Sequence, residues 1–154
     1  MYVINLFKEV FRLEHVRDVM TSDVEYCTPL DNVYEVAVKM KNLDCGAIPI
    51  CENDQLLGMI TDRDIVVRGV AEKRPNSTKV TDIMSEHLIT ADPGMSIDDA
   101  ANLMANHQIR RLPIVENNRL VGICALGDLA VNTGTDDEAG YALSEISERP
   151  EVHH

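Results

Sequence analysis

Tryptophan is absent from this 154-residue sequence, and aromatic residues make up only 4% of it. The core must therefore be filled by aliphatic residues, methionine and alanine, which belong to the 45% of residues that are hydrophobic. Charged residues contribute a further 26%, so the composition is that of an ordinary globular protein. The length suits one compact domain.

Basic residues are scarce as well, since 14 Lys and Arg stand against 26 Asp and Glu, a formal net charge of −12. A surface this acidic repels nucleic-acid phosphates and anionic lipids, so neither nucleic acid nor a membrane is expected as a partner. An anionic ligand must therefore bind at a local positive site that works against the overall field.

Long apolar runs are missing too, because no stretch approaches the roughly 20 residues of a membrane helix. Residues 1–15 lack the basic start and the continuous apolar stretch of a signal peptide, which favours a cytoplasmic protein. Residues 1–16 instead predict an amphipathic helix that packs on its own module or on a partner subunit. Its apolar face consists of Val3, Leu6, Phe7, Val10 and Leu13.

Cysteine pairs with the spacing of a metal site are not found either. The four cysteines, Cys27, Cys45, Cys51 and Cys124, form no C-x-x-C and lie in apolar stretches. They are interpreted as small buried hydrophobes in a reducing compartment. A metal-binding or redox protein that uses them together with histidines is the less favoured alternative, which metal analysis would test.

Motifs of enzymatic chemistry are missing from the sequence. It contains no G-x-S-x-G, no H-E-x-x-H and no P-loop. His15, His87 and His107 are scattered and lie near no nucleophile motif. We therefore expect a protein that is not an enzyme.

What the sequence does contain is an internal repeat. A shift of 64 positions, the separation of Asp18 from Asp82, aligns the two halves without a gap. The predicted organisation is an N-terminal helix (1–16), repeat one (17–70), a polar linker (71–80), repeat two (81–133) and a tail (134–154) with a docking helix at 136–147. Matched pairs include Met20 with Met84, Pro49 with Pro113, Gly58 with Gly122 and Asp64 with Asp128.

Each repeat predicts the same βαββα order, and the chain is therefore expected to be α+β. A short extended piece, 24–28 or 88–90, is followed by Pro29 or Pro93, and a helix follows with a capping box at Asn32-x-x-Glu35 or Ser96-x-x-Asp99. The apolar face of the helix is predicted to consist of Val33, Val36, Ala37 and Met40 in repeat one, and of Ile97, Ala100, Ala101 and Met104 in repeat two. Two strands joined by a tight polar turn come next, and a last helix starts near Asp62 or Leu126. One such unit is too small to bury its own sheet, so the copies are expected to pack around a pseudo-twofold axis.

These motifs resemble those of the cystathionine β-synthase (CBS) domain. The shared pattern is Asp-hydrophobic-Met-Ser/Thr, a helix, Ile/Leu-Pro-Ile, a polar turn, Leu-hydrophobic-Gly-hydrophobic and an Asp at a helix start. Two copies over residues 17–133 resemble a tandem CBS pair, or Bateman module, similar to small stand-alone bacterial CBS-pair proteins. The resemblance implies disc-shaped homodimers and a cleft between the repeats for AMP, ADP, ATP, NAD or S-adenosylmethionine.

The segment from Thr61 to Asp64 is the strongest candidate for ligand contacts. The Thr61 hydroxyl can bond a phosphate, and the two carboxylate oxygens of Asp64 can accept from both hydroxyls of a ribose. The resemblance implies that Asp64 is the ribose ligand, and Asp62 and Arg63 join this candidate site. Gly58 would let another backbone or the ligand approach closely. Thr61-x-x-Asp64 is also a capping box, and the two roles can coexist.

Two arginines before the Leu-Pro-Ile strand of repeat two are the next candidates. Arg110 and Arg111 stand where repeat one has Gly46 and Ala47. The resemblance implies that basic side chains at this place reach phosphates in the cleft, where a planar guanidinium binds in bidentate fashion. The alternative is that they are surface arginines that pair with the acidic surplus.

Apolar surroundings of Thr28, Ile48 and Pro49 could clamp a base, although core packing explains them equally well. A second, weaker site would use Asp128 and Pro113. There Ala125 replaces the Thr61 hydroxyl and Gly127 replaces Arg63, so a complete phosphate-binding edge is not expected.

Together these features predict a non-catalytic regulatory module. An adenine nucleotide would bind as a regulatory ligand rather than as an obligatory cofactor and would bias the shape of a homodimer that acts on an unidentified effector protein. The alternative, from another class of function, is a dimeric interaction scaffold that binds no ligand.

Overall fold

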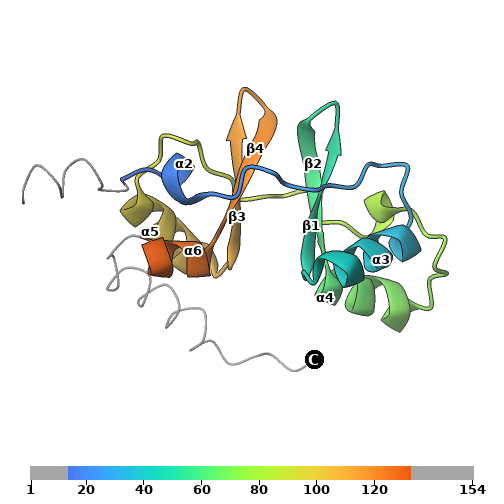
Figure 1. Ribbon diagram of the computed structural model, residues 1–154. Coiled ribbons are helices and arrows are strands. Elements are labelled where there is room, and N and C mark those ends of the chain that lie inside the picture. Colours follow the sequence, from blue (N-terminus) through green and yellow to red (C-terminus); the bar gives the residue numbers. More distant parts are fainter. Residues whose placement is uncertain (1–13, 133–154) are drawn as a thin grey trace, which may run out of the picture. The chain divides into compact units, whose positions relative to one another are not determined.

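The computed structural model describes residues 14–132, and the side chains of residues 14–129. It has the predicted α+β composition, and the described chain divides into two compact units (Figure 1). Unit 1 comprises residues 14–22, 89–116 and 121–132, and unit 2 comprises residues 23–88 and 117–120. The helices predicted for residues 1–16 and 136–147 lie outside the described residues, except for the last three positions of the first.

Unit 2 follows the order that the repeat predicts. The capping box of its first helix is confirmed, because Glu35 N–H donates to Asn32 Oδ1 at 2.9 Å and Asn32 N–H donates to Glu35 Oε2 at 3.2 Å. The elements of unit 2 are α3 (Val33–Leu43), β1 (Ala47–Glu52), β2 (Gln55–Thr61), α4 (Asp62–Asp64), the π-helix η1 (Ile65–Gly69) and the 3₁₀ helices η2 (Val70–Glu72) and η3 (Val80–Asp82).

The β1–β2 hairpin places the end of β2 beside the start of β1. The two strands are antiparallel, with Ala47 opposite Thr61. Asn53 and Asp54 in the turn have φ angles of 52° and 65°. A two-residue hairpin of this kind needs positive φ at both positions, and Asn and Asp tolerate it. The polar turn predicted for Glu52–Gln55 is therefore confirmed.

The helix after β2 changes its winding along its length. It begins at Asp62 as predicted, but it continues as a π-helix in which Val70 N–H donates to the Ile65 carbonyl, five residues back. Gly69 ends this turn close to the 3₁₀ segment, since a Cβ at Gly69 would lie 3.4 Å from Ile83 Cδ1. The π-helix therefore runs beside the residues that precede Ser85.

The core of unit 2 lies between α3 and the hairpin. Cys27 pairs with β1 in a parallel bridge, because its N–H donates to the Pro49 carbonyl at 3.0 Å and its carbonyl accepts from Cys51 N–H at 2.8 Å. Ala37, predicted on the apolar face of α3, is exposed, so that prediction was wrong. The buried cluster consists of Cys27, Val33, Val36, Met40, Ile48, Ile50, Ile60, Val80 and Ile83.

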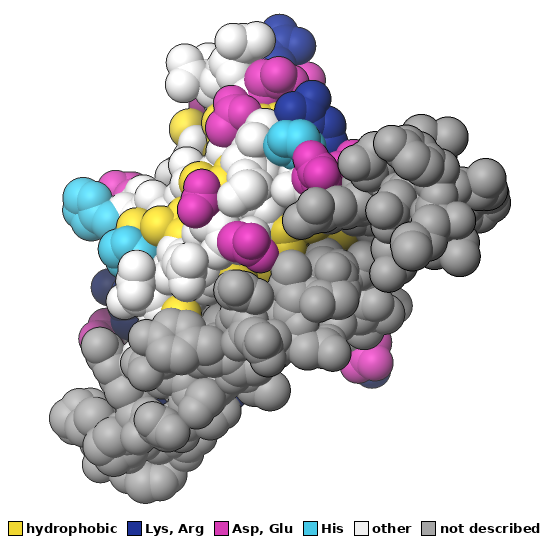
Figure 2. Space-filling model, turned by 90° about the vertical axis from the view of Figure 1, so that its left-hand side faces the viewer, with side chains coloured by type: hydrophobic (Ala, Val, Ile, Leu, Met, Phe, Trp, Pro, Cys, Tyr) yellow, Lys and Arg dark blue, Asp and Glu magenta, His cyan; other side chains and the backbone are white. Residues whose placement is uncertain are grey.

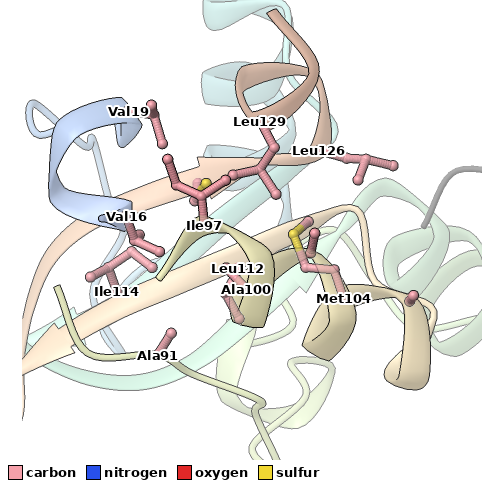
Figure 3. Packing of buried hydrophobic residues seen from close by; sticks show 13 residues of the cluster. Val16, Val19, Ala91, Ile97, Ala100, Met104, Leu112, Ile114, Leu126 and Leu129 are labelled. Carbon is pink, nitrogen blue, oxygen red and sulfur yellow. The ribbon is translucent and has the colours of Figure 1, made fainter. Parts of the chain in front are cut away.

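Unit 1 repeats this plan with its own core. Side chains of α2, α5, β3 and α6 point toward one another in Figure 3. The apolar face predicted for α5 is confirmed, since Ile97, Ala100, Ala101 and Met104 are all buried. Its elements are α2 (Val16–Val19), α5 (Ile97–His107), β3 (Arg111–Glu116), all but the first two residues of β4 (Arg119–Ala125), and α6 (Leu126–Asn132). Strand β3 is hydrogen-bonded to β4.

The leading segment of each sequence repeat packs on the hairpin of the other copy. Ser85 bridges to Met59 in β2, and Thr21 bridges to Ile123 in β4. Glycine makes both contacts possible: a Cβ at Gly58 would lie 2.8 Å from the Ser85 carbonyl oxygen, and one at Gly122 would lie 2.9 Å from that of Thr21. The close backbone approach predicted at Gly58 is confirmed.

The first strand of each βαββα repeat is shorter than predicted. Instead of strands over 24–28 and 88–90, the structure has single parallel bridges, Cys27 with Ile50 and Ala91 with Ile114. Thr28 ends the first, because its N–H donates to Asp31 Oδ2 at 2.7 Å and turns the chain. A proline follows each bridge within two residues and cannot donate to a ladder.

Candidate functional site

The edge where β2 ends in unit 2 brings together the strongest predicted site residues. Asp64 Oδ2 accepts from Thr61 N–H at 2.9 Å, and Thr61 Oγ1 accepts from Asp64 N–H at 3.1 Å. The predicted capping box is thus confirmed. Only 17% of the Asp64 side chain is exposed. Its carboxylate is therefore held in one orientation at the end of a buried strand.

Arg68 is a further member of this edge. Its Nη2 lies 2.9 Å from Asp64 Oδ1 and donates to Ser85 Oγ at 3.1 Å. The sequence analysis did not single out Arg68, although it stands four residues after Asp64 on a predicted helix, where ion pairs form. Ser85 carried no comparable signal, because its contact with Arg68 comes from the packing of residues 80–88 against β2 within unit 2.

Asp62 and Arg63 lie on the exposed side of the same turn. Asp62 N–H donates to the Gly46 carbonyl at 2.9 Å, and Asp62 Oδ1 accepts from Arg63 N–H at 2.8 Å. The Asp62 carboxylate fills the space beside Gly46, where a Cβ would lie 2.9 Å from Asp62 Oδ2. Repeat two instead carries Arg110 at the position of Gly46 and Leu126 at that of Asp62.

The matching edge of unit 1 keeps the backbone frame. Ala125 N–H donates to Asp128 Oδ2 at 3.0 Å, and Leu126 N–H donates to the Arg110 carbonyl at 2.9 Å. Ala125 offers no hydroxyl, as the sequence indicated. The side chains of Arg110 and Arg111 are exposed. Both arginines belong to unit 1, whereas Thr61–Asp64 belong to unit 2.

The weaker candidates lie in packed surroundings. The side chain of Ile48 is 1% exposed, and Pro49 and Pro113 are buried, so only their backbones could reach a ligand. Thr28 is half-buried and bonded to Asp31. Burial alone would raise the pKa of Asp31, but the Thr28 N–H, Glu35 and Lys39 outweigh it and hold that pKa below its ordinary value.

Three of the four cysteines are buried as predicted, whereas Cys45 is only half-buried. Burial raises the pKa of Cys27 and Cys51 to about 11 and that of Cys124 to about 12. Thiolate is the form that binds metals and reacts, so burial disfavours the reactive form of these three cysteines. Among residues 14–132, no group of three His, Cys, Asp or Glu side chains converges as a metal site would require.

Unit 2 also carries an apolar surface. All seven large hydrophobic residues that are exposed among the described residues belong to it: Tyr26, Leu30, Tyr34, Leu43, Val66, Val67 and Val70. Two of the seven, Tyr34 and Val70, border a groove of about 150 Å³ that Ala37 and Arg74 also line, and this groove with its rim is called the apolar surface of unit 2 below. Where the face in Figure 2 is not grey, acidic side chains are interspersed with basic, histidine and hydrophobic ones. No helix within residues 14–132 is long and apolar enough to cross a membrane.

Comparison with known proteins matches the chain to one family model twice. The model described as "CBS domain" covers residues 16–69 and 80–132. The uncharacterized protein YlbB of Bacillus subtilis is 51% identical over 135 residues, which are 86% of this chain and 91% of that protein.

Two solved structures are similar in fold and sequence. Hypoxic Response Protein I of Mycobacterium tuberculosis, solved with two coordinated zinc ions, has a TM-score of 0.70 and 36% identity over 75% of this chain and 96% of that one. The CBS domain pair of protein MJ0100, in complex with 5′-methylthioadenosine and S-adenosyl-L-methionine, has a TM-score of 0.69 and 25% identity over 79% of this chain and 97% of that one.

Proposed function

The chain belongs to the CBS-domain family, and we propose that it is a non-catalytic sensor whose edge at Thr61–Asp64 binds the ribose and phosphate of an adenosine-containing ligand. The candidates are AMP, ADP, ATP, NAD and S-adenosylmethionine. The ligand acts as a regulatory signal, and a partner protein of unknown identity receives it. Binding can shift such a module only if its two states differ in affinity for the ligand.

The observation that carries the proposal is the orientation of the Asp64 carboxylate. Its two oxygens offer about four acceptor positions. Thr61 N–H and Arg68 Nη2 occupy one on each oxygen, at 2.9 Å in both cases. One position per oxygen is left for the two hydroxyls of a ribose, and only a vicinal diol satisfies both. Thr61 Oγ1 already accepts a bond, so its hydroxyl proton can be donated to a phosphate.

Exposed arginines supply the positive charge that a phosphate requires. Arg63 lies beside the edge, and we propose that Arg110 or Arg111 also contacts the ligand, as the family resemblance implies. Thr28, Ile48 and Pro49 would contribute backbone and packing around a base. A weaker second site at Asp128 and Pro113 would hold at most a nucleoside, because Ala125 lacks the hydroxyl. The adenosine ligands bound by MJ0100 support this ligand class.

A panel of nucleotides tests the proposal directly. Thermal unfolding should be followed with each of the five candidate ligands, and a nucleotide at about 100 times its dissociation constant should add roughly 2.7 kcal/mol to the free energy of unfolding. No shift with any of the five would contradict the proposal and favour the ligand-free scaffold. Zinc should be titrated in parallel, since Hypoxic Response Protein I coordinates zinc ions.

We also propose that a second copy of the chain covers the apolar surface of unit 2. Tyr34 is 59% exposed and Val70 is 68% exposed, and both border the same groove. A twofold dimer needs one self-complementary patch on each subunit, and an apolar surface confined to one unit provides it. The matched position of Tyr34 in repeat two is Asp98, which would resist such burial.

A further inference from the structure

Arg68 connects the candidate ligand edge to the segment that leads into repeat two. One nitrogen, Nη2, contacts both Asp64 Oδ1 at 2.9 Å and Ser85 Oγ at 3.1 Å. Ser85 is itself fixed to β2, because its N–H donates to the Met59 carbonyl at 2.8 Å and its carbonyl accepts from Met59 N–H at 3.0 Å. The guanidinium is therefore anchored, unlike that of an ordinary surface arginine.

Helical spacing and the packing of η1 place Arg68 beside both partners. Asp64 and Arg68 stand four residues apart, a spacing at which opposite charges pair along a helix. Gly69 at the same turn packs against Ile83, which brings the neighbouring residue alongside Ser85. In repeat two the position that matches Arg68 is Asn132, and the helix there is α-helical.

This arrangement sets the local charge. Asp62 and Asp64 would otherwise present two carboxylates where the proposed ligand places its phosphate, and like charges repel. Arg68 balances the less exposed of the two, Asp64. One further donor of the guanidinium, Nε, is buried and has no hydrogen-bond partner among the described residues. Because Nε is shielded from solvent, a phosphate would meet the exposed part of the side chain instead, 42% of which is accessible.

Building on the proposed function, we propose that Arg68, anchored on Ser85, determines the charge class of the ligand. With Arg68 on Asp64, the edge prefers a phosphorylated ribonucleoside such as AMP to uncharged adenosine and to the cationic sulfonium nucleoside S-adenosylmethionine. Arg68 is therefore a specificity-determining residue for the phosphate.

Calorimetric titration of the full chain with AMP, adenosine and S-adenosylmethionine tests this. Arg68→Met removes the charge and keeps the stem, so AMP affinity should fall about tenfold while adenosine affinity stays within about threefold. Arg68→Lys should recover part of the AMP preference, because it restores the charge without the planar fork. Ser85→Ala should shift the preference in the same direction as Arg68→Met, by a smaller factor.

The matched control is Arg119→Met, an exposed arginine of the same unit that lies opposite Gln55, at the other end of β2 from Thr61. It should leave all three affinities unchanged. An unchanged ratio of AMP to adenosine affinity in Arg68→Met, or an equal loss of both, overturns this inference and leaves the proposed function standing. If Arg68→Met does not fold, an unchanged ratio in both Arg68→Lys and Ser85→Ala overturns it. A wild-type chain that binds none of the three ligands overturns the proposed function, and this inference with it.

Discussion

The two repeats build the same edge from unequal side chains. In each, the residue that ends the second strand donates its N–H to an aspartate three positions later, at 2.9 Å in unit 2 and 3.0 Å in unit 1. The N–H of the following residue, Asp62 or Leu126, donates to the carbonyl of the residue before β1 or β3, at 2.9 Å in both units. Backbone hydrogen bonds, which most sequences can form, therefore give both edges the same shape. The edges differ in side chains, because unit 2 has Thr61 and Arg68 where repeat two has Ala125 and Asn132.

The largest expected effect is a difference in AMP affinity between variants of Asp64 and of its matched residue Asp128. Asp64→Asn removes one acceptor for the ribose diol and the charge that holds Arg68, so AMP affinity should fall about 100-fold or more. Asp128→Asn makes the same change on the weaker edge and should alter AMP affinity by less than about threefold. Calorimetric titration of the two variants checks this, and equal losses would show that the repeats are functionally equivalent.

A second comparison concerns the apolar surface of unit 2. Tyr34→Glu combined with Val70→Glu places charges in the proposed dimer interface, so the dimer should dissociate to monomers at micromolar concentration. Asp98→Lys changes the position in repeat two that matches Tyr34 and should leave the dimer intact. Sedimentation velocity measures both. A wild-type monomer, or a dimer that survives the double substitution, would contradict the assignment.

The two strand glycines should respond alike, because both repeats need the same close approach. Gly58→Ala and Gly122→Ala would place a Cβ 2.7 and 2.6 Å from the Met84 and Met20 sulfur atoms, respectively. Each should lower the free energy of unfolding by about 1–3 kcal/mol in urea titrations. Gly127→Ala is the control, since nothing lies within 4 Å of its Cβ. If only one of the two substitutions lowered the free energy of unfolding, only one of the two leading segments would be tightly packed against its glycine.

The smallest expected effect comes from exchanging the N-cap residues Thr61 and Ala125 between the two repeats. Thr61→Ala removes the oxygen that accepts from Asp64 N–H and should cost about 1 kcal/mol of unfolding free energy, whereas Ala125→Thr should add up to about that amount. Urea denaturation of both variants and of wild type gives the two differences. The account of the shared frame fails if Ala125→Thr destabilises the protein as much as Thr61→Ala does.

Much of the fold was readable from the sequence, because the repeat, the capping boxes and the hairpin turns are local signals. The sequence did not predict that the leading segment of each repeat, which contains Thr21 or Ser85, packs on the hairpin of the other repeat. Both hairpins carry the same glycine, Gly58 or Gly122, so either accepts either Asp-hydrophobic-Met segment, and only long-range packing selects one. The exposure of Ala37 likewise depends on the groove beside η1.

The site was predictable where one short segment supplies it. Thr61 and Asp64 stand three residues apart and meet through a local capping box. Arg68 was overlooked because its importance depends on Ser85, which is 17 residues away in sequence. Ile48 and Pro49 lie in the core, since β1 is buried on both faces.

The central claim is that the Asp64 carboxylate accepts from both hydroxyls of a ribose. Calorimetric titration of the wild-type chain with AMP and with 2′-deoxy-AMP tests it most directly. We expect AMP to bind at least about tenfold more tightly, because a hydrogen bond to a charged acceptor contributes roughly 1.5–3 kcal/mol. Equal affinity for the two nucleotides would contradict the claim.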